Sequence, residues 1–196
     1  IGTVTVSPTS NNGNATVQVS GATDGVGNLM AAVSSACTFM IDTHGPAASI
    51  QDPASLVNGH VITSGNVDIV INLSDDGTGV DSSTILLKIG TTSGTRECTI
   101  GGNPTTMLGT LTYAANLLTY HPNTSFPEGT LTIWLDEAKD QVSHSLQSKP
   151  VVRVFCVDTL SPTADNPTPS PNSVITNASI TPTVMIGDGA NGSGID

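Results

Sequence analysis

Alternating apolar and polar residues dominate the middle of the chain. Residues 67–73 read Val-Asp-Ile-Val-Ile-Asn-Leu, and a similar alternation covers 130–135 and 151–157. Because successive side chains of a strand point to opposite faces, a period of two predicts strands with one buried face. Gly, Pro and Asp gather between these segments, as they do in turns. The expected strands are 48–52, 67–73, 84–89, 96–100, 111–114, 118–121, 130–135 and 151–157.

About seven short strands in roughly 116 residues predict an all-β fold, most simply a Greek-key β-sandwich. The composition agrees, because only 11% of residues are charged and Asp outnumbers Glu by 13 to 3, which leaves few residues that favour a helix surface. A helical bundle is therefore excluded. The residues expected to line the core are Ile69, Ile71, Leu86, Leu131, Ile133, Leu135, and Val154 or its neighbours.

One segment of the chain recurs 116 residues later. Residues Thr38–Pro46 read Thr-Phe-Met-Ile-Asp-Thr-His-Gly-Pro, and Val154–Pro162 read Val-Phe-Cys-Val-Asp-Thr-Leu-Ser-Pro. The same offset aligns Asp24 with Asp140. After each Asp-Thr-x-x-Pro comes a further match, Gly-Val-Asp at 79–81 and Gly-Ile-Asp at 194–196. Several matches in the same order predict an internal repeat.

The repeat divides the chain into three parts. Residues 43–158 are expected to form one complete repeat. Residues 1–42 would then be the C-terminal part of the repeat before it, and residues 159–196 the N-terminal part of the next. The chain is therefore expected to be a piece of a longer protein.

Four short motifs carry a resemblance to a known family. They are Pro-Glu-Gly-Thr-Leu-Thr-Ile at 127–133, Asp-Glu-Ala-Lys-Asp at 136–140, Phe-Cys-Val-Asp-Thr at 155–159 followed by Pro162, and Gly-Val-Asp at 79–81. Together they resemble the bacterial and archaeal immunoglobulin-like tandem repeats of large extracellular surface proteins, of adhesin, surface-layer or filament type. The resemblance implies immunoglobulin-like Greek-key sandwiches in tandem, outside the cell and at its surface. The Cys and Trp spacing of antibody domains is absent.

The charge of the chain limits its partners. A net charge of −11 repels phosphate backbones and anionic lipids, so nucleic-acid binding and electrostatic membrane docking are disfavoured. No apolar run has the length of a membrane span. Divalent cations are the natural partners of such an acidic chain.

Acidic residues concentrate in loops that a Greek-key sandwich would bring to the pole where the chain enters. Carboxylates on flexible, Gly-rich loops are the oxygen ligands that calcium prefers, although the spacing is not that of an EF-hand. The alternative is that Asp simply favours turns, because its side chain bonds to its own backbone. The candidate metal ligands, at this pole and at the matching junction with the next repeat, are Asp42, Asp75, Asp76, Asp81, Asp136, Asp140, Asp158, Asp188 and Asp196.

Catalysis finds no support in the sequence. The four histidines, His44, His60, His121 and His144, show no pattern with a nucleophile or a metal ligand and are expected to be turn or solvated residues. Three scattered cysteines suit neither a zinc site nor a disulfide scaffold, and Cys156, in an apolar strand, is expected to be buried. No enzyme is therefore expected.

Two functions remain. The first is a structural repeat protein that forms a stalk, sheath or filament, whose partners are neighbouring repeats and copies of itself, with junctions stiffened by calcium. The second is an adhesin module that binds a glycan or a protein. Trp134, Tyr113 and Tyr120 could form a small sugar-binding platform, but strand alternation favours the core or a sheet face for them.

Overall fold

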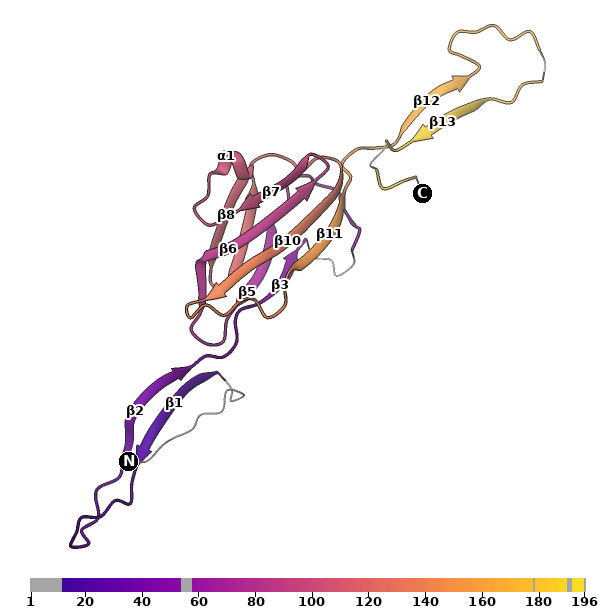
Figure 1. Ribbon diagram of the computed structural model, residues 1–196. Coiled ribbons are helices and arrows are strands. Elements are labelled where there is room, and N and C mark those ends of the chain that lie inside the picture. The colour runs from indigo at the N-terminus through magenta and orange to yellow at the C-terminus, as the bar shows by residue number, and fades with distance from the viewer. Residues whose placement is uncertain (1–11, 54–57, 178, 190–191, 196) are drawn as a thin grey trace.

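A computed structural model describes residues 12–53, 58–177, 179–189 and 192–195, and within them the protein is mostly β with one short helix. A central sandwich lies between two separate hairpins, which extend from its opposite ends (Figure 1). The N-terminal hairpin pairs β1 (Gly13–Val19) with β2 (Val33–Ile41), and the C-terminal one pairs β12 (Thr163–Thr168) with β13 (Thr183–Gly187). This architecture confirms the all-β expectation.

The sandwich consists of a five-stranded and a four-stranded sheet. The first has the order β4-β11-β10-β6-β7 and the second β3-β5-β9-β8. All neighbours are antiparallel except β11 and β4, which pair in parallel. The strands are β3 (Ala47–Asp52), β4 (His60–Ile62), β5 (Ile69–Ser74), β6 (Val80–Thr91), β7 (Gly94–Cys98), β8 (Gly109–Ala114), β9 (Leu117–Pro122), β10 (Gly129–Asp140) and β11 (Val151–Val157).

Two elements have no counterpart among the expected strands. The short strand β4 follows residues 54–57, and a single helical turn, α1 (Pro104–Met107), joins the two sheets. Asn103 caps this turn, because its side chain accepts the Thr105 N–H, and Pro104 occupies the first helical position. Met107 buries its side chain beneath the turn.

The core follows the period of two. Ile69, Ile71, Leu131, Ile133 and Leu135 are all 0% exposed, as expected. On β6 the expected phase is wrong by one residue, since Ile85, Leu87 and Ile89 are buried and Leu86 is half-exposed. On β11, Phe155 and Val157 face the core in place of Val154, and Cys156 is half-buried on the opposite face, so the expectation that Cys156 is buried is wrong.

The pairing registers of both hairpins recur inside the sandwich. Gly13 pairs with Ile41 in the first hairpin, and Gly129 pairs with Val157 in the sandwich. Gly129 follows Gly13 by 116 positions, and Val157 follows Ile41 by the same number. In the C-terminal hairpin Thr163 pairs with Gly187, and in the sandwich Ala47 pairs with Ser74. Thr163 follows Ala47 by 116 positions, and Gly187 follows Ser74 by 113. Each hairpin thus has the register of a strand pair in the sandwich.

Positions that are buried in the sandwich are exposed in the hairpins. Phe155 is 1% exposed, whereas Phe39, 116 positions earlier, is 38% exposed. Ile71 is 0% exposed, and Val184, at the matching register position of β13, is 50% exposed. The hairpins therefore carry an apolar face with no second sheet packed over it among the described residues.

Candidate functional site

The acidic loop between β5 and β6 wraps around Asp42, which follows β2. The backbone N–H and the hydroxyl of Thr78 both donate to Asp42 Oδ2, at 2.7 and 2.6 Å. The Asp42 side chain is only 3% exposed. A Cβ atom at position 77 would overlap the Asp42 carboxyl group, which explains the glycine there. Burial acts to raise the pKa of Asp42, but hydrogen bonds from Thr78 and the His44 N–H, together with nearby His144, lower it below its usual value.

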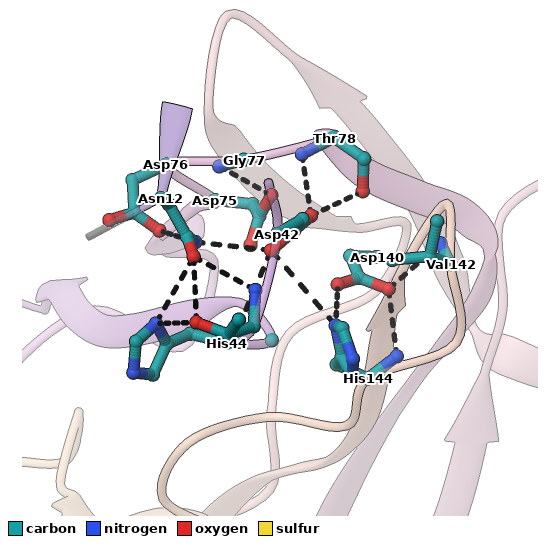
Figure 2. A network of polar contacts seen from close by, with 12 residues as sticks. Asn12, Asp42, His44, Asp75, Asp76, Gly77, Thr78, Asp140, Val142 and His144 are labelled. Carbon is teal, nitrogen blue, oxygen red and sulfur yellow. Dashed lines mark hydrogen bonds and ion pairs between the residues drawn. The ribbon is translucent and has the colours of Figure 1, made fainter. Parts of the chain in front are cut away.

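Asp75 is held by the same loop. Its Oδ2 accepts the N–H groups of Gly77 and Gly79 at 3.0 and 2.8 Å, so the amides of residues 77 to 79 serve two neighbouring carboxylates (Figure 2). Its other oxygen, Oδ1, is buried and has no hydrogen-bond partner among the described residues. A buried oxygen with an open lone pair is costly unless a cation or a donor meets it.

Asp140 ends β10 and brings a second loop to the same place. Asp140 Oδ1 accepts the N–H groups of Val142 and His144 at 2.9 and 2.7 Å, the pattern by which Asp closes a tight turn. Its Oδ2 lies 2.7 Å from His144 Nδ1, which in turn lies 4.0 Å from Asp42 Oδ1. The Asp140 side chain is 0% exposed and that of His144 is 41% exposed.

Asp42, Asp140 and His144 form a group that could hold a metal ion. Each offers one ligand atom, and the three atoms lie within 4.8 Å of one another. The group joins the end of β2 to the loop that follows β10, across the junction of the N-terminal hairpin with the sandwich (Figure 2). We call it the junction centre.

Asn12 closes the network from the hairpin side. Its Nδ2 donates to Asp42 Oδ1 at 3.1 Å and to Asp76 Oδ1 at 2.8 Å. Its Oδ1 accepts the N–H and the hydroxyl of Thr43 at 2.8 and 3.0 Å. One amide therefore satisfies two carboxylates and the linker backbone, which brings Asp76 to the edge of the site.

The linker itself is packed on the β10–β11 loop. Gln147 Nε2 donates to the Gly45 carbonyl at 2.8 Å, and the Gln147 N–H donates to the Pro46 carbonyl at 2.9 Å. A Cβ atom at Gly45 would overlap the Ser145 carbonyl group. The close approach of two backbones thus requires glycine at position 45 and fixes the direction of the chain as it enters the sandwich.

A second network lies at the other end of the sandwich. Asp158, 116 positions after Asp42, is 8% exposed, and its Oδ2 accepts the Ser193 N–H at 2.6 Å. Hydrogen bonds from Ser193 lower the pKa of Asp158. Asp188 Oδ2 accepts the Gly194 N–H at 2.8 Å, and one oxygen each of Asp158 and Asp188 is buried with no partner among the described residues.

Glu128 occupies at this second network the place that Asn12 has at the first. Both carboxylate oxygens of Glu128 accept the Thr159 N–H, at 3.2 and 3.1 Å, and the Thr159 hydroxyl donates to Oε1. The pairs Asn12–Thr43 and Glu128–Thr159 are 116 positions apart. The contacts Asp42–Thr78 and Asn12–Thr43 of the first junction therefore correspond to Asp158–Ser193 and Glu128–Thr159 of the second, where a carboxylate replaces the amide.

The remaining predicted ligands lie elsewhere. Asp81 binds the Ser83 N–H and hydroxyl with one oxygen, at 3.0 and 2.6 Å. Asp136 pairs with Lys88 Nζ at 2.9 Å between β10 and β6. Neither belongs to the junction centre, and Asp196 lies outside the described residues.

Sequence reasoning missed Asn12, Thr78 and His144. The interpretation of His144 as a turn or solvated residue overlooked its contacts with two buried carboxylates. One signal was available for His144, namely its spacing of four residues from Asp140, which matches the spacing of Asn28 from Asp24, 116 positions earlier. Asn12 carries no such signal, because it reaches Asp42 and Asp76 from far away in the sequence.

Comparison with protein-family models and with curated proteins finds no match for this chain. Its assignment to a family therefore stays a resemblance. Within the described residues, no helix is long and apolar enough to cross a membrane.

Proposed function

We propose that the chain is a section of an extracellular structural protein built from tandem immunoglobulin-like sandwiches, which serve as a stalk, sheath or filament at a cell surface. In this arrangement residues 43–158 are one complete repeat. The observation that carries the proposal is the recurrence, 116 positions apart, of the register that joins β1 to β2 and β10 to β11.

Side-chain hydrogen bonds support the same offset. In one loop Asp24 Oδ1 accepts the N–H groups of Val26 and Asn28, at 3.0 and 2.9 Å. In the other, Asp140 Oδ1 accepts the N–H groups of residues 142 and 144. Bridges between Thr23 and Leu29 and between Lys139 and Ser145 flank the two loops at the same spacing. Local sequence alone does not require such detailed agreement, whereas a structural repeat does.

The exposed faces of the hairpins support completion by neighbouring repeats. Phe39, Val184 and Ile186 are 38, 50 and 57% exposed at positions whose counterparts in the sandwich are buried. Burial of apolar area stabilises at about 25 cal/mol per Å², so an uncovered row of such residues favours association with the rest of a sandwich. Repeats joined in this way would give a long molecule with a buried core in each unit.

The junctions would set the stiffness of such an array. Several carboxylates meet where the linker enters the sandwich, and their mutual repulsion would be offset by a divalent cation. Calcium is the cation that the acidic loops predict, because carboxylate oxygens are the ligands that it prefers.

Duplication of the repeat tests the proposal. A chain that runs from residue 1 to 158 and continues with 43 to 196 restores every junction, because residue 158 takes the place of residue 42. We expect one additional folded sandwich, seen as a proportional rise in unfolding enthalpy and as an added length in small-angle scattering.

The matched control duplicates residues 59–158, which omits β3 and is out of register. It should expose apolar surface, bind a hydrophobic dye and aggregate. Equal behaviour of the two chains would overturn the repeat.

The adhesin alternative has weaker support, because Tyr120, one of the three expected platform aromatics, is only 2% exposed and donates its hydroxyl to the Met107 carbonyl. Micromolar binding on a glycan array would favour it instead.

A further inference from the structure

His144 changes the class of cation that the N-terminal junction should bind. The expectation of calcium rests on carboxylates, and calcium takes oxygen ligands. An imidazole nitrogen suits zinc and other borderline divalent metals. We infer that the junction centre of Asp42, Asp140 and His144 binds a borderline divalent cation of the zinc class in preference to calcium. The inference deepens the proposed junction and rests on the same residues.

The spacing of the ligand atoms fits such an ion. Bonds of about 2.0 to 2.1 Å in a tetrahedral zinc site put neighbouring ligand atoms roughly 3.3 Å apart. His144 Nδ1 lies 2.7 Å from Asp140 Oδ2 and 4.0 Å from Asp42 Oδ1, values that bracket this distance. Small side-chain shifts would therefore bring all three atoms to bonding distance of one ion.

Hydrogen bonds from the surrounding loops prepare the two carboxylates for this role. Asp42 Oδ2 is taken by Thr78, and Asp140 Oδ1 is taken by the N–H groups of its own turn. The oxygens nearest to His144 are consequently Asp42 Oδ1 and Asp140 Oδ2. Bonds from neighbouring groups that hold ligands in place are typical of metal sites in proteins.

Two further observations point to a bound cation. The side chains of Asp42 and Asp140 are 3% and 0% exposed, so two carboxylates meet with little water to screen them. Beside them, the buried Oδ1 of Asp75 has no partner among the described residues, although its other oxygen is fully bonded. An ion at the junction centre would offset the first cost, and its charge would also stabilise the carboxylate of Asp75, which lies near Asp42 (Figure 2).

The chain supplies its own comparison for His144. In the corresponding loop Asn28 stands in its place and donates to Asp24 Oδ2 at 2.7 Å, as His144 bonds to Asp140. The loop therefore folds with either residue, and the substitution His144→Asn should remove the nitrogen ligand while it keeps the turn. The histidine makes the difference in metal chemistry between the two loops.

Isothermal titration calorimetry of the whole 196-residue chain tests the inference, with zinc chloride and calcium chloride as probes at pH 7.5. A Cys37→Ser background removes the exposed thiol, which could itself bind zinc. We expect one zinc ion at micromolar or tighter affinity, at least tenfold weaker in His144→Asn, and calcium affinity unchanged by that substitution. His121→Asn is the matched control, because His121 Nδ1 lies 2.6 Å from Asp68 outside the centre, and it should leave zinc binding intact.

Three results would overturn the inference: zinc binding of equal strength in His144→Asn, equal loss in His121→Asn, or calcium binding so tight that zinc does not displace it. Nitrogen chemical shifts of the His144 ring provide a second readout, since zinc should shift them directly. Circular dichroism shows whether each variant has kept its fold. Failure here leaves the duplication test untouched, because that test needs no metal, so the centre and the array can fail separately.

Discussion

The two junctions of this chain share a backbone plan and differ in charge. At the N-terminal junction Asp42 accepts a hydrogen bond from the Thr78 N–H, and at the C-terminal junction Asp158 accepts one from the Ser193 N–H. Asn12 closes the first with two N–H donors, whereas the second carries the carboxylate of Glu128 at the corresponding place. The same hydrogen-bonded frame thus carries an amide donor at one junction and an additional carboxylate at the other.

The partners of the two aspartates also differ in position. Thr78 belongs to the β5–β6 loop of the sandwich, while Ser193 lies beyond β13, outside the sandwich. Loss of Asp42 should therefore weaken the sandwich itself, and loss of Asp158 should release the C-terminal hairpin.

The largest effect is expected from Asp42→Ala. This substitution leaves the Thr78 N–H and hydroxyl and an Asn12 donor without their charged acceptor, at a cost of about 3 kcal/mol in the free energy of unfolding. Asp158→Ala should change the unfolding of the sandwich by less than about 0.5 kcal/mol. Urea unfolding followed by the fluorescence of Trp134, which lies in β10, measures both. Equal losses would contradict the distinction between the two aspartates.

A smaller effect is expected from the linker. In Gly45→Val the new side chain overlaps the Ser145 carbonyl, which should cost about 1 to 3 kcal/mol and separate the linker from the β10–β11 loop. Ser161→Val is the matched control, because Ser161 stands at the corresponding place of the second linker and is exposed. Hydrogen exchange of the Gln147 amide, which donates to Pro46, should rise in the first variant and stay unchanged in the second.

The sequence was a good guide where alternation was regular and a poor one where two phases were possible. On β6 the run Ile-Leu-Leu-Lys fits either phase, and Lys88 decides it, since its ion pairs with Glu97 and Asp136 place its ammonium group at the sheet surface and turn Leu87 inward. The strand expected at 130–135 is too short, because β10 continues through the polar residues from 136 to Asp140, and Ala138 is 0% and Asp140 1% exposed there.

The sequence predicted where the acidic residues would meet, but it did not predict which residues would form the site. Asp42, Asp75, Asp76 and Asp140 do meet at the end of the sandwich, as the topology of a Greek key led us to expect. Asp81 and Asp136 were expected there as well, but Asp81 bonds to Ser83 and Asp136 pairs with Lys88 instead. Long-range side-chain contacts depend on the exact direction of each strand end, and residue spacing does not supply that information.

The smallest effect is the exchange of charge between the junctions. Asn12→Asp replaces two donors by a carboxylate that faces Asp42 and Asp76, and so gives the N-terminal junction the charge of its counterpart. We expect a loss of about 1 kcal/mol at low ionic strength, because like charges in a partly exposed setting repel modestly. Sodium chloride should recover part of this loss by screening, and a divalent cation should recover more, since it can bind the added oxygen directly.

Asn12→Ser, which removes the donors without adding charge, separates the contribution of the lost hydrogen bonds from that of the added charge. If it loses as much stability as Asn12→Asp and gains nothing from added cation, charge does not distinguish the junctions, and the difference between Asn12 and Glu128 is one of hydrogen bonding alone.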